Sequence, residues 1–163
     1  MRASQEFIKD HLSDLFVKVR NGLYALRLNQ PHEEVLANRL YAPSYISFEY
    51  ALSKYGIIPE SVYTITSATT RLTREFTVGH HAFSYAHIKK EVYRGYESKK
   101  IGKTTVLIAY PEKALIDYLY FVDLRLKSLN DRLNVKTIRK KEAILYASYF
   151  KRPSLQKFVR KIL

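Results

Sequence analysis

The sequence contains no cysteine and no tryptophan, and only five glycines and five prolines among 163 residues. Without cysteine, disulfide bonds, thiolate zinc sites and cysteine nucleophiles are excluded. Neither a Gly-x-x-x-x-Gly-Lys phosphate-binding loop nor a Gly-x-Ser-x-Gly nucleophile turn occurs, and Gly102-Lys103-Thr104 has no upstream glycine. These absences leave no motif for phosphate-loop or serine-hydrolase chemistry, and no cofactor is predicted.

Long apolar runs are also missing. No run approaches the ~18 residues that cross a bilayer, and the first ten residues lack the apolar core of a signal peptide. We therefore predict a cytoplasmic protein with no membrane partner. The composition, 47% hydrophobic and 13% aromatic, is typical of a globular chain.

Positive charge is concentrated at the C-terminal end. Between residues 124 and 163, twelve Lys and Arg stand against two acids, so this segment holds +10 of the chain's net +13. Such a field attracts polyanions, nucleic acid first among them. A solubilising face or a docking surface for an acidic protein would use the same charges. The candidate DNA contacts in this segment are Arg139, Lys140, Lys141, Lys151, Arg152, Lys157, Arg160 and Lys161.

The first 28 residues have the pattern of a helix followed by a hairpin. Residues 4–15 carry apolar side chains at helical spacing, and residues 16–20 alternate like a half-exposed strand. Asn21-Gly22 favours a two-residue turn, after which residues 23–28 pair back. This order matches the second half of a winged helix, whose hairpin touches the DNA backbone. The candidate contacts on the hairpin are Lys18, Arg20 and Arg27.

The rest of the chain alternates between helical and extended patterns. Ser44 or Ser47 is expected to cap a helix that Gly56 ends. The expected helices cover residues 31–40, 48–55, 111–126, 140–150 and 154–162, and the expected strands cover 62–66, 74–78, 82–88, 91–96 and 104–109. The predicted fold class is α+β, with a partial winged helix at 1–28, a mixed α/β domain at 29–125 and a basic helical extension at 126–163.

Metal-dependent chemistry finds little support. The side chains that could take part are His11, His32, His80, His81, His87, Glu75, Glu91, Glu97 and Glu112. No two histidines form a helical i, i+4 pair around a glutamate. The glutamates lie near lysines, which suits a metal-dependent nuclease or ordinary surface ion pairs. Because nothing commits two carboxylates to one ion, no metal site is predicted, and the protein is expected to bind and not to catalyse a reaction.

Several motifs follow one another between about residues 16 and 124. They are Asn21-Gly-Leu-Tyr-Ala-Leu26, Leu36-Ala-Asn-Arg-Leu40, Pro43-Ser-Tyr-Ile-Ser-Phe-Glu-Tyr-Ala-Leu52, Tyr55-Gly-Ile-Ile-Pro59, Val62-Tyr-Thr-Ile-Thr-Ser-Ala-Thr-Thr-Arg71, Thr73-Arg-Glu-Phe76, Phe83-Ser-Tyr-Ala-His-Ile-Lys89 and Ile108-Ala-Tyr-Pro-Glu-Lys-Ala-Leu-Ile-Asp117. In this order they resemble the AbiEi antitoxin family.

The resemblance implies a transcriptional regulator with an N-terminal, DNA-binding winged helix and a mixed α/β domain. It implies the antitoxin of a type IV toxin–antitoxin or phage-defence pair, which counters a nucleotidyltransferase-like toxin without a tight complex. About fifteen residues precede the hairpin here, fewer than a full winged helix needs, so its N-terminal part is expected to be incomplete. Tyr63, Arg71 and Arg74 lie in matched motifs, on the expected surface of the second domain. Two other function classes remain open, a protein-interaction module without specific DNA binding and a nuclease-like enzyme.

Overall fold

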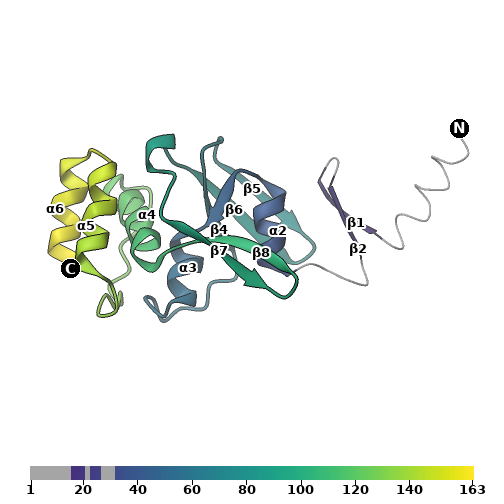
Figure 1. Ribbon diagram of the computed structural model, residues 1–163, viewed down its shortest axis with the longest axis horizontal. Helices are drawn as coiled ribbons and strands as arrows, with labels where there is room; N and C mark the ends of the chain where they lie inside the picture. Colours follow the sequence, from purple (N-terminus) through teal and green to yellow (C-terminus); the bar gives the residue numbers. More distant parts are fainter. Residues whose placement is uncertain (1–15, 21–22, 27–31) are drawn as a thin grey trace, which may run out of the picture.

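The fold is α+β, as predicted, and is built from helices and a mixed six-stranded sheet (Figure 1). The computed structural model describes residues 16–20, 23–26 and 32–163, with side chains from His32 onward. The helix expected at residues 4–15 and the candidate contact Arg27 lie outside the described residues. No helix in the described part is long and apolar enough to cross a membrane.

The N-terminal hairpin has the two predicted strands. β1 (Phe16–Arg20) pairs antiparallel with β2 (Leu23–Leu26), with Phe16 opposite Leu26. The pair makes a two-stranded sheet separate from the six-stranded one. Lys18 and Arg20 therefore lie on a strand, as expected, while the Asn21-Gly22 turn is outside the described residues.

The main sheet has the order β5-β6-β4-β3-β8-β7. Its strands are β3 (Ser44–Ile46), β4 (Ile65–Thr69), β5 (Arg74–Val78), β6 (His81–His87), β7 (Tyr96–Ile101) and β8 (Thr104–Ala109). The pairs β3–β8 and β4–β6 are parallel, and the other three neighbouring pairs are antiparallel. The predictions for β5 and β8 are confirmed at both ends.

Two strand predictions need correction, and one strand is additional. The strand expected at 62–66 begins at Ile65, because β4 pairs with β6 from Ile65 opposite Phe83, and both of these side chains are buried. Tyr63, by contrast, is 87% exposed, so tertiary pairing overrides the β propensity of its segment. The strand expected at 91–96 is a 3-10 turn, η1 (Lys90–Val92), and β7 starts only at Tyr96. The short β3 was not predicted.

The helices lie close to their predicted positions. They are α2 (Glu33–Leu40), α3 (Phe48–Lys54), α4 (Pro111–Asp123), α5 (Lys140–Tyr149) and α6 (Pro153–Ile162). Gly56, with φ of +66°, follows α3 as expected. Ser47 precedes α3, but its hydroxyl makes no capping hydrogen bond and donates instead to Asp117. Ser44 lies in β3.

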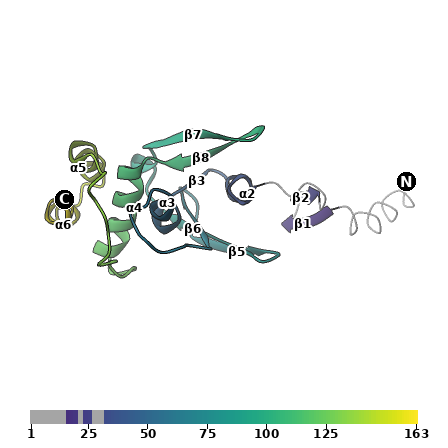
Figure 2. The ribbon, with the colours of Figure 1, turned by 90° about the horizontal axis from the view of Figure 1, so that it is seen from below.

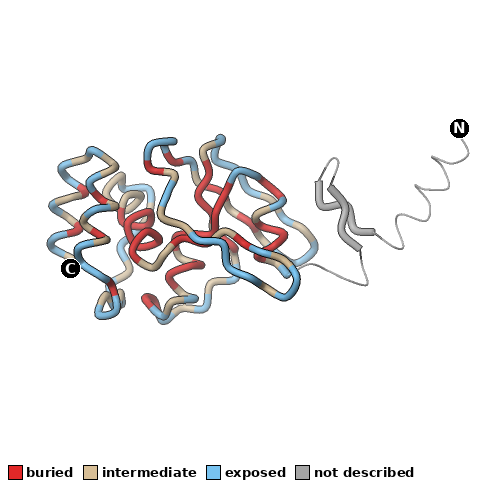
Figure 3. The backbone as a smooth tube through the Cα atoms, in the orientation of Figure 1, coloured by how far each residue is buried: buried red, intermediate tan, exposed pale blue. Residues whose placement is uncertain are grey.

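Helix α4 is the centre of the molecule. Its residues from Glu112 to Leu119 are all buried (Figure 3). Figures 1 and 2 place α4 between the sheet and the pair α5–α6. Ala143 and Ala147 of α5 and Leu155 of α6 belong to the same hydrophobic core as the sheet. The C-terminal helices therefore complete the core by covering the outer side of α4.

Candidate nucleic-acid interface

Helix α6 separates apolar and basic side chains onto two faces. Leu155 and Val159 are buried, whereas Lys157, Arg160 and Lys161 are exposed. Spacings of three and four residues place these three cations on one side of a helix, which we call the α6 basic face. The helix contains no acid, and no ion pair involves these cations within residues 32–163.

Helix α5 begins with two further exposed cations, Lys140 and Lys141. Lysines are unfavourable at this end because the helix dipole is positive there. The Glu112 carboxylate compensates in part, since its Oε1 accepts the backbone N–H of Arg139, the residue before α5, at 3.2 Å. In the described part of the chain, Lys140 and Lys141 have no ion-pair partner.

Two candidate contacts already have partners inside the fold. Arg139 forms an ion pair with Glu112, and Arg152 forms one with Asp123, which also accepts a hydrogen bond from Ser154 at 2.8 Å. Burial alone would raise the pKa of Glu112, but hydrogen bonds from Arg139 outweigh it and hold this pKa below its ordinary value. Because both guanidinium charges are compensated locally, they add little to the field outside.

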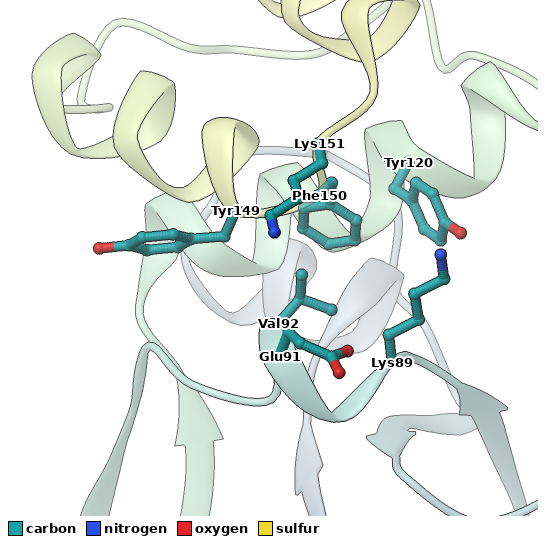
Figure 4. Close-up of a pocket in the computed structure, with 7 residues that line it drawn as sticks. All are labelled: Lys89, Glu91, Val92, Tyr120, Tyr149, Phe150 and Lys151. Atoms are coloured by element: carbon teal, nitrogen blue, oxygen red, sulfur yellow. The ribbon is translucent and has the colours of Figure 1, made fainter.

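The last candidate, Lys151, lies in the turn between α5 and α6. It is exposed and has a φ of +50°, a left-handed conformation that glycine adopts with less strain. Its side chain stands at the edge of a pocket of 270 Å³ between η1 and this turn (Figure 4). Lys151 thus links the basic helices to a concave site.

The β7–β8 hairpin carries three exposed lysines that were not among the predicted contacts, Lys99, Lys100 and Lys103. Its turn contains Gly102, with φ of +58°. The run Lys-Lys-Ile-Gly-Lys was a visible signal, but it was considered only as a fragment of a phosphate-binding loop. In Figure 1 the turn of this hairpin points away from α5 and α6, so these lysines form a separate basic site.

A polar cluster is enclosed between α4 and the sheet, and the sequence did not reveal it. Asp117, fully buried, accepts hydrogen bonds from the hydroxyls of Tyr45 at 2.9 Å and Ser47 at 2.8 Å and forms an ion pair with Lys113. The side chain of Lys113 is 1% exposed. Burial lowers the pKa of Lys113, while the adjacent Asp117 opposes this shift. Since no solvent reaches these groups, we assign the cluster to holding α4 on the sheet.

The metal candidates do not converge. Glu75 lies on β5 and Glu97 on β7, the two opposite edge strands of the sheet. Glu112 is held by Arg139, and His81 contacts Glu33, with Nδ1 3.0 Å from Oε2. Among the residues that the structure describes, no three His, Asp or Glu side chains gather as a potential ligand set.

Comparison with protein-family models and with curated proteins finds no match to this chain. The functional proposals below therefore depend on the chain's own residues and on the sequence motifs described above.

Proposed function

We propose that this protein is a DNA-binding regulator of the antitoxin type and that the α6 basic face, with Lys140, Lys141 and Lys151, is its main phosphate-contacting surface. The main support for this proposal is the composition of the α6 basic face. It presents three exposed cations on a helix without acids, and none of them has an ion-pair partner among residues 32–163. Arg139 and Arg152 are left out of this surface because they pair with Glu112 and Asp123.

A surface of this kind binds DNA mainly by displacing counterions from the phosphates. Lysine and arginine contacts to phosphate fix position and orientation but read no sequence. Sequence preference would have to come from the N-terminal segment, where Lys18 and Arg20 lie on a hairpin strand that matches the wing of a winged helix.

The antitoxin role is supported by the motifs that resemble the AbiEi family. In this role the protein represses its own operon and counters a nucleotidyltransferase-like toxin without forming a tight complex. The buried motifs fit a structural purpose in that comparison, since Asp117 of the last motif holds Tyr45 of an earlier one.

The test is binding of the full chain to its own upstream duplex and to a scrambled duplex across a salt series. The variant K157A/R160A/K161A removes the α6 basic face, and K99A/K100A/K103A is the matched control, because it removes the same charge from the β7–β8 hairpin. We expect the α6 variant to bind both duplexes more weakly, with a log–log salt slope reduced by about 0.9 for each lost phosphate contact. The control variant K99A/K100A/K103A should change neither the duplex affinity nor the salt slope appreciably.

Equal weakening by both variants would reduce the effect to net charge and overturn the assignment of the α6 basic face. Equal binding of the upstream and scrambled duplexes at every salt concentration would contradict a sequence-specific regulator and favour docking of an acidic protein. Cleavage of either duplex that requires Mg²⁺ and stops with EDTA would establish the nuclease alternative.

A further inference from the structure

The pocket between η1 and the α5–α6 turn combines aromatic rings with flexible cations. Tyr120 and Phe150 form one wall, with their ring centroids 4.5 Å apart and the ring planes tilted by 41°. Lys89 and Lys151 reach the cavity from two different segments, and Glu91 faces it from η1 (Figure 4). All three charged side chains are exposed, and none has an ion-pair partner within the described ranges.

Cationic side chains pack against the aromatic rings of the pocket. The ammonium of the buried Lys113 lies 5.2 Å from the centroid of the Phe150 ring, on which Tyr120 also packs. Arg94 lies over the ring of Tyr149, another residue of the lining, at 4.7 Å. A planar ligand would therefore meet rings that are already positioned, while the two lysines remain free to adjust.

We propose that this pocket binds one unpaired nucleotide of a nucleic-acid strand, with the base against Tyr120 and Phe150 and the phosphate beside Lys89 and Lys151. Stacking of bases on aromatic rings in a cationic groove is the general mode of single-strand recognition. Glu91 is placed to accept a hydrogen bond from an amino group of the base or a hydroxyl of the sugar. This proposal extends the proposed DNA binding, on which it rests in part.

Size and charge select the ligand. A volume of 270 Å³ lies just below the range of typical ligand pockets, roughly 300–1,000 Å³, so the pocket has room for one nucleotide and not for two stacked ones. Two ammonium groups and one carboxylate leave a charge of +1, which matches one phosphodiester. A free triphosphate would bring several negative charges toward Glu91. A nucleotide within a strand therefore fits better than a free nucleotide.

Lys151 provides a variant that separates binding from folding. Its left-handed backbone conformation is one that glycine adopts without strain, so Lys151→Gly removes the ammonium while easing the turn. Lys103→Ala, at the exposed turn of the β7–β8 hairpin, is the charge-matched control. For the aromatic wall, Tyr120→Leu removes the ring and Tyr120→Phe keeps it.

The experiment measures fluorescence anisotropy of the full chain with a labelled 12-nucleotide single strand, and with the upstream duplex, for each of these variants. We expect Tyr120→Leu to weaken single-strand binding roughly tenfold and leave duplex binding unchanged, with Tyr120→Phe close to the unsubstituted protein. Lys151→Gly should lower the single-strand salt slope by about 0.7, and Lys103→Ala should leave it unchanged.

Unchanged single-strand affinity in a folded Tyr120→Leu protein would overturn the proposal, as would an equal loss with Lys103→Ala and Lys151→Gly. Displacement of the strand by AMP at the same nucleotide concentration would assign the pocket to a free nucleotide and overturn the strand assignment. Unchanged duplex binding by K157A/R160A/K161A would contradict the role of the α6 basic face, whereas unchanged single-strand binding by Tyr120→Leu would contradict the role of the pocket. The two proposals are therefore tested independently.

Discussion

Arg139 holds the carboxylate of Glu112 with both ends of its guanidinium, Nε to Oε1 at 2.9 Å and Nη2 to Oε2 at 3.1 Å. Since Glu112 lies in the first turn of the central helix α4 and Arg139 immediately precedes α5, this pair fastens the outer helical layer to the core. The carboxylate is buried and the guanidinium is mostly exposed. The interaction therefore matters chiefly because Glu112 has no other cation to compensate it in the described part of the chain.

Replacing Arg139 with alanine should lower the midpoint of thermal unfolding and loosen the outer layer, because the buried Glu112 would lose its counter-charge. Hydrogen–deuterium exchange should increase in α5 and α6 more than in the sheet. Lys140→Ala removes a neighbouring exposed cation and is the control, for which we expect no comparable change. Equal exchange in both variants would show that the Arg139 pair contributes nothing specific.

The same pair predicts a dependence on pH. Burial would raise the pKa of Glu112, but its bonds to Arg139 keep the pKa below 4.5, the ordinary value. A carboxyl whose pKa is lower in the folded chain stabilises the fold fully above the unfolded value, and the contribution is lost as the pH falls through the folded value. The difference in unfolding free energy between the unsubstituted protein and Glu112→Gln should thus be constant from pH 7 to about 5 and shrink in stronger acid. A difference that grows on acidification would contradict this assignment.

The buried Asp117 is the position where we expect the largest single loss. Asp117→Ala leaves the Lys113 ammonium and two hydroxyls without their partner, at a cost of about 3–5 kcal/mol. Asp117→Asn keeps a hydrogen-bond acceptor for Tyr45 and Ser47 but leaves the Lys113 ammonium without its counter-charge. The double variant K113M/D117N should therefore be more stable than D117N alone in urea unfolding. The opposite order would show that Lys113 stabilises the fold independently of Asp117.

Substitution of Gly95 and of Gly102 distinguishes the cost of backbone strain from the cost of a steric clash. Both have positive φ, +78° and +58°, but a Cβ on Gly95 would lie 2.6 Å from Cε1 of Tyr146, whereas none of the atoms around Gly102 comes within 4 Å. Gly102→Ala should cost about 1–2 kcal/mol from the backbone conformation alone. Gly95→Ala should cost about 1–3 kcal/mol more, because Tyr146 of α5 must move. Urea unfolding of the two variants measures the difference, and equal losses would mean that the outer layer yields freely at Tyr146.

Local signals in the sequence were sufficient to predict most elements of the fold. Pro111 begins a helix at the first turn and Gly56 ends one, because each acts through its own backbone geometry. The last helix was expected from residue 154 and begins one residue earlier, at Pro153. The order of the strands and the position of β4 were not predictable in this way. They depend on pairing between distant segments, such as Ile65 with Phe83, which no local pattern specifies.

The candidate site divides in the same manner. Lys157, Arg160 and Lys161 were selected from the sequence because positive charge is concentrated in the last forty residues. That they share one face of α6 is a finding of the structure. That Arg139 is paired was not predictable, because its partner Glu112 lies 27 residues earlier. The pocket was missed because η1, α4 and the α5–α6 turn, which form it, are brought together only by the tertiary fold.

Strand β3 spans only Ser44 to Ile46, yet it joins β4 on one side and, through Ile46 and Ile108, β8 on the other. Strand β4 ends at Thr69, whereas β8 ends only at Ala109. A chain emerging from the ribosome can assemble β3 to β6 while β3 still has one open edge. Synthesis of β8 closes that edge, and α4, which follows directly, delivers Lys113 and Asp117 to the interior. We therefore expect the core to be completed late during translation, and a nascent chain arrested before residue 104 to expose a sheet edge that the finished protein conceals.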